Sequence, residues 1–173
     1  NENVATAKTM ILDGNSSSIT FGPKTTAPFI VGENITLTIQ NITLENFNLS
    51  RFSFLGSGSS KAKIIFGDNV ILRVSEDITI TTGGLVLTGN TTIMGVSNAS
   101  TLDLDSQAIS LTGADKTLSL QGLNINYKAA DAIKINTSSA TLVYKSSQVY
   151  IQSSGVTFDN GNLKIHDEVS FCG

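Results

Sequence analysis

Short runs in which apolar residues alternate with polar or small ones recur along nearly the whole chain of 173 residues. Successive side chains of a β-strand point to opposite faces, so this period of two predicts strands that each bury one face. Helical spacing is absent after residue 12. The chain is therefore predicted to be all-β, with strands of about three to five residues. The runs include ITLTI at 35–39, ITL at 42–44, ITI at 78–80, LVL at 85–87, LDL at 102–104, LSL at 118–120, IKI at 133–135 and LKI at 163–165.

The spacing of these runs distinguishes between all-β folds. Neighbouring runs are about 5 to 9 residues apart, which leaves turns of about two to five residues that are rich in Gly, Asn, Asp and Ser. Three runs fall in each period of about 20 residues, the pattern of a three-strand unit that stacks into a parallel β-solenoid. At about 4.8 Å per coil, roughly seven coils make a rod about 35 Å long. Apolar residues at this period are expected to form one buried ladder, with Leu104, Ile125 and Ile165 nearly fully buried: Ile64, Leu85, Leu104, Ile125, Tyr144 and Ile165.

Three stretches resemble coils of right-handed parallel β-helix proteins, the broad pectate-lyase-like architecture of many secreted and surface proteins: ITLTIQNITLENFNL at 35–49, LSLQGLNINY at 118–127 and VTFDNGNLKI at 156–165. The resemblance covers residues 15–171 and implies an all-β, right-handed parallel β-helix (β-solenoid) of about seven short three-strand coils. It implies little about activity, because one fold hosts many functions. Residues 15–173 are then the β-solenoid domain. Residues 1–14 are expected to be an N-terminal segment, helical or extended, that serves as a cap or an inter-subunit strand.

Composition excludes several classes of function. Charged residues make up 14% of the chain, against about a quarter in typical soluble domains, and hydrophobic residues make up 40%. This apolar content and a net charge of −3 argue against disorder, and the eleven basic residues form no patch of the kind that binds nucleic acid. No apolar run approaches the ~18 residues of a membrane span. The glycines at 56 and 58 lack the following Lys-Ser/Thr of a phosphate-binding loop, and no cofactor is predicted.

Two carboxylates are the strongest candidates for catalytic chemistry. Asp103 and Asp105 alternate with Leu102 and Leu104, so both are expected on the outer face, roughly 7 Å apart. In similar β-helix enzymes that cleave acidic polysaccharides, outward carboxylates act as acid and base or hold calcium, and this spacing would suit an inverting glycosidase. The supporting Gly-His-Gly and Arg-Ile-Lys strings are missing, which favours two solvated charges. A calcium site that also includes Asp131 is the remaining alternative, without further support.

His and Cys each occur once. His166 lies on the outward phase, and we expect a surface histidine in preference to a member of a Ser-His-acid triad. Cys172 excludes an internal disulfide framework and is interpreted as a small apolar residue of a strand. An intermolecular bridge or a reactive thiol are the alternatives, although only Lys164 and His166 are close enough in sequence to lower the pKa of the thiol.

Seven Asn-x-Ser/Thr strings occur, a mild excess over the about three or four expected by chance. In a eukaryotic secreted chain they would be glycosylation sites. The stronger interpretation is structural, because Asn tolerates left-handed turns and stacked Asn side chains hydrogen-bond between coils. Thr-x-Thr pairs at 36–38 and 79–81 are typical of ice-binding solenoids, but charged residues on other coils interrupt such a face. The seven asparagines are Asn15, Asn34, Asn41, Asn48, Asn90, Asn98 and Asn136.

These observations favour a structural protein over an enzyme. Low charge, polar outer positions and near-continuous coils suggest a secreted, extracellular or cell-surface fibre or filament subunit. A carbohydrate-active β-helix enzyme and a carbohydrate-binding, tailspike-like adhesin, with surface polysaccharide as partner, are the alternatives. No catalytic or metal-ligating residues are predicted.

Self-assembly is predicted from the two ends of the rod. The first and last coils of a solenoid leave unpaired backbone groups that template pairing with another chain. No cap follows the last apolar strand, so either the native chain continues beyond it or the last coil docks on the first coil of another copy. We expect docking, head to tail, with residues 1–14 lying across the junction as an added strand. The predicted assembly interface consists of Val4, Met10, Ile11, Val169, Phe171 and Cys172.

Overall fold

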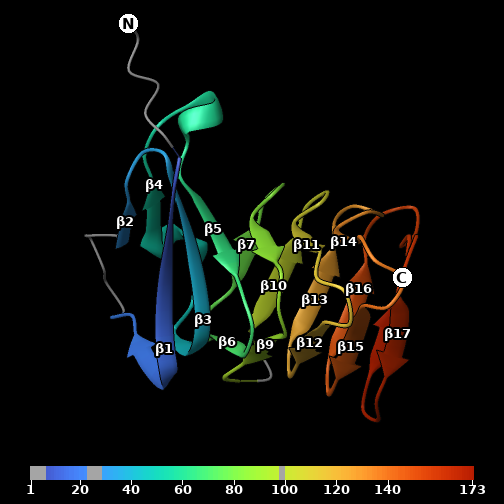
Figure 1. Cartoon of the computed structure of the whole chain (residues 1–173). Helices are drawn as coiled ribbons and strands as arrows, with labels where there is room; N and C mark the ends of the chain where they lie inside the picture. Colours follow the sequence, from blue (N-terminus) through green and yellow to red (C-terminus); the bar gives the residue numbers. More distant parts are fainter. Residues whose placement is uncertain (1–6, 23–28, 98–99) are drawn as a thin grey trace, which may run out of the picture.

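The computed structural model describes residues 7–22, 29–97 and 100–173, which form an all-β parallel solenoid of about seven turns. Figure 1 shows the coils following one another from β1 (Lys8–Thr20) at one end of the rod to β17 (Asn162–Ile165) at the other. All strand pairings within the described residues are parallel. The predicted all-β solenoid of about seven coils is therefore confirmed.

Each complete coil contributes one short strand to each of three walls. The first wall contains the first half of β3 (Ile35–Glu45), β5 (Lys63–Phe66), β8 (Leu85–Leu87), β11 (Ile109–Leu111) and β14 (Ile133–Ile135). The second wall contains the second half of β3, β6 (Val70–Val74), β9 (Thr91–Gly95), β12 (Thr117–Gln121), β15 (Thr141–Lys145) and β17. The third wall contains β7 (Ile78–Ile80), β10 (Thr101–Leu104), β13 (Asn124–Tyr127), β16 (Gln148–Ile151) and β18 (Ser170–Cys172).

The first two coils are built differently from the rest. β1 and β3 are long strands that run through the bend between the first two walls and pair along most of their length. Their third side is a separate two-stranded sheet of β2 (Phe29–Val31) and β4 (Phe52–Phe54), with 3-10 turns at Leu49–Arg51 and Gly58–Ser60 on either side of β4. The predicted boundary between residues 14 and 15 lies inside β1, so residues 8–13 already belong to the first coil.

Inward side chains stack in ladders, but the register differs from the predicted one. In the third wall Leu102 lies between Ile78 and Ile125, and Leu104 pairs with Tyr127. The single ladder predicted from Ile64 to Ile165 is wrong, because its members come from different walls: for example, β8 belongs to the first wall, β10 to the third and β15 to the second.

Variable turns explain this error. Paired residues are separated by as few as 21 positions, as for Leu142 and Leu163, and by as many as 28, as for Ile42 and Val70. Extra residues at a bend do not change which strands pair, because the bends lie on the surface where loops tolerate insertion. Residues counted at a fixed period of about 20 therefore fall in different walls along the chain.

The burial prediction is confirmed for Leu104 and Ile125, which are fully buried, and wrong for Ile165, which is 53% exposed. Ile165 has the inward phase, because it pairs with the buried Tyr144. It lies in β17, the outermost strand of the second wall, where no further coil of the described residues packs on it. In a solenoid an inward phase leads to full burial only between two coils.

The bends between the walls use backbone conformations that Asn adopts more readily than most residues. Asn15, Asn34 and Asn41, three of the seven Asn-x-Ser/Thr asparagines, have positive φ, as does Asn69. A short polar side chain that hydrogen-bonds locally makes this left-handed conformation accessible. These three asparagines therefore occupy left-handed turns, as the structural interpretation expects, whereas Asn98 lies outside the described residues.

Candidate functional site: the two end coils

An apolar surface lies at the C-terminal end of the rod. Leu163, Ile165 and Phe171 carry the inward phase of the last coil, and each is at least two-fifths exposed. Phe171 stacks on Val149 in the third wall, and its ring contacts that of Tyr144 edge to face with centroids 5.8 Å apart. These three side chains form what we call the C-terminal end surface.

A second apolar surface lies at the other end. Met10, Ile19 and Phe29 pair with the core residues Leu37, Leu44 and Phe52, and they share the inward phase of those residues. Met10 is nevertheless 52% exposed, and Ile19 and Phe29 are also exposed, because β1 and β2 are the outermost strands of their sheets. We call these three residues the N-terminal end surface.

The residues predicted to form the assembly interface fall into two groups. Met10 and Phe171 belong to the end surfaces, and the partly buried Val169 packs against the core beside β18. Ile11 and Cys172 are also exposed, but they do not belong to the end surfaces because their side chains point outward. Ile11 pairs with Thr38 and Cys172 pairs with Tyr150, and both partners have the outward phase. Val4 lies outside the described residues.

Sequence reasoning missed the other members of the two end surfaces, namely Leu163, Ile165, Ile19 and Phe29. Their alternation identifies them as inward residues, but their exposure depends on which strand is outermost in its wall. Register is not visible in the sequence, so no local signal could have found them.

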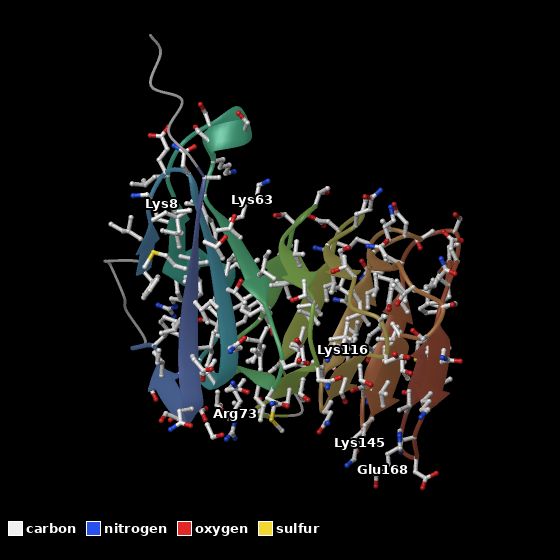
Figure 2. All side chains as sticks on the ribbon, viewed as in Figure 1. Lys8, Lys63, Arg73, Lys116, Lys145 and Glu168 are labelled. Atoms are coloured by element: carbon white, nitrogen blue, oxygen red, sulfur yellow. The ribbon has the colours of Figure 1, made fainter. Side chains whose placement is uncertain are left out.

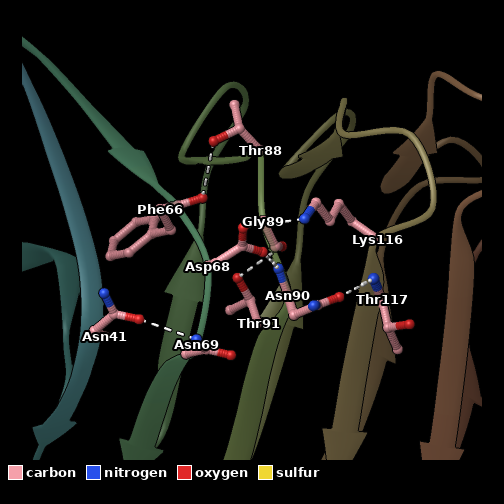
Figure 3. Close-up of polar contacts among 10 residues, drawn as sticks. All are labelled: Asn41, Phe66, Asp68, Asn69, Thr88, Gly89, Asn90, Thr91, Lys116 and Thr117. Atoms are coloured by element: carbon pink, nitrogen blue, oxygen red, sulfur yellow. Dashed lines mark hydrogen bonds and ion pairs between the residues drawn. The ribbon is translucent and has the colours of Figure 1, made fainter. Parts of the chain in front are cut away.

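A chain of side-chain hydrogen bonds runs along the bend between the first and second walls to the N-terminal end. Asn69 donates from Nδ2 to Oδ1 of Asn41 (2.9 Å), a contact visible in Figure 3, and Asn41 donates from Nδ2 to Oδ2 of Asp13 (3.1 Å). The hydrogen bonds from the Gln40 side chain, the Asn15 backbone and the Asn41 side chain lower the pKa of Asp13. Asp13 therefore ends this chain in the first coil as a carboxylate.

Asp68, at the same bend, connects three coils (Figure 3). Its Oδ1 accepts the backbone N–H of Asn90 in the next coil (2.9 Å), and its Oδ2 pairs with Nζ of Lys116, one coil further on (3.0 Å). The Lys116 contact therefore spans the intervening coil, to which Asn90 belongs. The backbone bond from Asn90, followed by the Lys116 contact, lowers the pKa of Asp68 although burial opposes the shift. These contacts bind three neighbouring coils to one another.

Asp103, one of the two candidate carboxylates, is engaged in similar contacts on the outer face of the third wall. Lys128 pairs with its Oδ2 (2.6 Å), and Asn126 donates from Nδ2 to its Oδ1 (2.7 Å). Burial raises the pKa of Asp103, but the Lys128 and Asn126 hydrogen bonds outweigh it and the net pKa is lowered. A carboxylate held ionised in this way is a poor proton donor at neutral pH.

The remaining candidates are separate from one another. Asp131 accepts a hydrogen bond from Ser106 (3.0 Å), and His166 is exposed in the last coil. Within residues 7–22, 29–97 and 100–173, no group of three or more His, Cys, Asp or Glu side chains is placed to hold a metal ion. No helix in this part of the chain has the length and apolarity needed to cross a bilayer.

Comparison of the chain with family models, with curated proteins and with solved structures gives no match.

Proposed function

We propose that this protein is a structural β-solenoid subunit that docks head to tail on other copies of itself and so forms a filament. The observation that carries the proposal is that inward side chains are exposed at both ends of the same rod. Each end also has outermost parallel strands, β1 and β2 at one end and β17 and β18 at the other, that carry a free edge among the described residues. Such edges readily pair with further strands.

A second copy fits the C-terminal end surface because the second wall of the solenoid reaches both ends of the rod. The same inward ladder is therefore exposed at its N-terminal and its C-terminal end. The inward ladder that contains Leu44 begins at Ile19 and ends at Ile165. Docking would place Ile19 of one copy on Ile165 of the preceding one and extend both ladders. Fully burying a large apolar side chain contributes about 1.5–3 kcal/mol. Because two different surfaces meet, the contact does not close on itself and propagates.

The proposal includes a secreted, extracellular or cell-surface location and a relation to surface and fibre proteins of pectate-lyase-like architecture. Low charge and a polar exterior support this location and this relation. The contacts of Asp103 with Lys128 and Asn126 support a structural role in preference to an enzymatic one. Polysaccharide cleavage that is lost in Asp103→Asn would contradict the non-enzymatic part of this proposal.

Sedimentation velocity over a range of protein concentrations tests the docking. The wild type is expected to form species of increasing size without a plateau. Ile19→Lys blocks the N-terminal end surface, and the double variant Leu163→Lys/Phe171→Lys blocks the C-terminal one, because a docked lysine would be buried without a partner. Each blocked variant alone is expected to stay monomeric.

Mixing the two blocked variants gives the sharpest result. One retains a free C-terminal end surface and the other a free N-terminal one, so the mixture is expected to stop at a dimer. The control variant Thr79→Lys/Thr92→Lys adds two charges to outer positions and is expected to assemble like the wild type. A monomeric wild type at every concentration, or dimers formed by one blocked variant alone, would refute head-to-tail docking.

A further inference from the structure

A groove of about 800 Å³ lies on the flank of the rod, where the two-stranded sheet of β2 and β4 gives way to the third wall. Phe52 and Phe54 of β4 line one side, and residues 81–84, which directly follow β7, line part of the other. Clefts of this volume are typical of ligand sites. The groove contains none of the residues of the two end surfaces.

The walls of the groove are largely apolar. The rings of Phe52 and Phe54 are nearly parallel, with centroids 6.3 Å apart, and Leu49 packs over Gly84. Ile65 and Val86, the outward-facing residues of β5 and β8, also line the groove. The outward positions of later strands in the same wall are polar. Both side chains are half-buried and face the groove, where an occupant could bury them further.

Two lysine side chains provide positive charge at the groove. Lys61 and Lys63 line it, and neither forms an ion pair with a carboxylate of the described residues. Figure 2 shows Lys63 projecting clear of the ribbon at the start of β5. An acidic group on the occupant would give these ammonium groups a partner.

Strand edges add a third element of recognition. β4 pairs only with β2, and β7 pairs only with β10 among the described strands, so the two sheets face this region with unpaired edges. An extended peptide can pair with such an edge and direct alternate side chains to opposite sides.

We infer that this groove binds an extended peptide segment of a partner protein, in which apolar and acidic residues alternate. The apolar side chains pack between Phe54 and Val86, and the carboxylates pair with Lys61 and Lys63. A polysaccharide fits less well, because Ser50, Thr81 and Thr82 are the hydroxyl side chains that the lining offers to a polyhydroxylated chain.

The test uses the full chain and a six-residue peptide in which Glu and Val alternate, with fluorescence polarisation for affinity and NMR chemical shifts for the location. Binding is expected to shift the amide signals of residues 61–65 and 81–86. The double variant Lys61→Gln/Lys63→Gln should weaken binding about tenfold at low salt. Val86→Thr, which removes an apolar contact without changing shape, should also weaken it.

Matched controls separate these effects from general charge and stability. Lys134→Gln/Lys145→Gln removes two charges elsewhere, and Val143→Thr makes the same change at an outward position of β15; both should bind like the wild type. A peptide in which Lys replaces Glu should not bind. Three results would overturn the inference: no binding of the acidic peptide at millimolar concentration, shifts that map elsewhere, or a polyuronate that binds the groove when the peptide does not.

Discussion

At the residue scale, the closeness of the coils limits which side chains fit at the bends. Gly89 occupies a bend where a Cβ atom would overlap the backbone of Gly67 and Asp68 in the preceding coil. Its φ is not in the left-handed region, so the requirement is one of space.

Gly89→Ala is therefore expected to lower the free energy of unfolding by about 1–3 kcal/mol, because the added methyl group overlaps backbone atoms of a bend that is held by the adjoining strands β5 and β6. Thermal and denaturant unfolding followed by circular dichroism would measure the change. Gly22→Ala is the control, since a Cβ there meets no heavy atom within 4 Å. Equal stabilities of the two variants would show that the coils at Gly89 are not in close contact.

A buried tyrosine pair links the second and third walls across the core. The hydroxyl groups of Tyr127 and Tyr144 hydrogen-bond to each other, and both side chains are fully buried. Burial, with the neighbouring Tyr144 as a further cause, raises the pKa of Tyr127 well above its ordinary value of 10.0, and burial also raises the pKa of Tyr144.

This pair predicts a loss of stability at alkaline pH. Because the folded protein holds both protons more tightly than the unfolded chain, the contribution is complete below pH 10 and is lost as the pH rises above it. The free energy of unfolding of the wild type should fall between about pH 10 and 12, and that of Tyr127→Phe/Tyr144→Phe should fall much less. Identical slopes for the two proteins in denaturant titrations would contradict the burial of these hydroxyls.

At the element scale, the sequence was sufficient to predict strands and their three-fold grouping but not their register. Alternation marks Leu102, Leu104 and Ile125 as inward whatever their partners are, and all three are buried. Pairing depends on bend lengths, which vary without leaving a periodic signal. The end surfaces were predicted only at Met10 and Phe171, because exposure of an inward residue is a property of the strand order.

The flank groove was not predictable for a related reason. Phe52 and Phe54 read as an ordinary alternating strand, and β4 is indeed a strand. The groove exists because β4 pairs with β2 in a separate sheet and not with β7. The alternation of apolar and polar residues is the same whether a strand continues the third wall or belongs to a separate sheet.

Elements should differ in their protection from hydrogen exchange. In dilute solution, amides of β12 and β13, which have strands on both sides, are expected to exchange far more slowly than those of β1, β17 and β18. After concentration, docking should slow exchange in these end strands and leave the central ones unchanged. Uniform exchange, or protection that rises only in central strands, would contradict end-to-end contact.

At the scale of the whole molecule, the described residues form a short rod with exposed inward side chains at both ends. Its middle coils are held by paired walls and a continuous apolar core, while inward side chains of the first and last coils remain exposed. In the proposed filament, stacking rods end to end would continue the strand pairing and the inward ladder of the second wall.

Cryo-electron microscopy of the concentrated wild-type protein tests this most directly, through the helical rise per subunit. With about seven turns per chain and about 4.8 Å between strands, end-to-end docking predicts a rise of about 34 Å along the filament axis, with strands perpendicular to that axis. Side-by-side packing of rods, a rise unrelated to the stack of coils, or only single rods at high concentration would contradict the account.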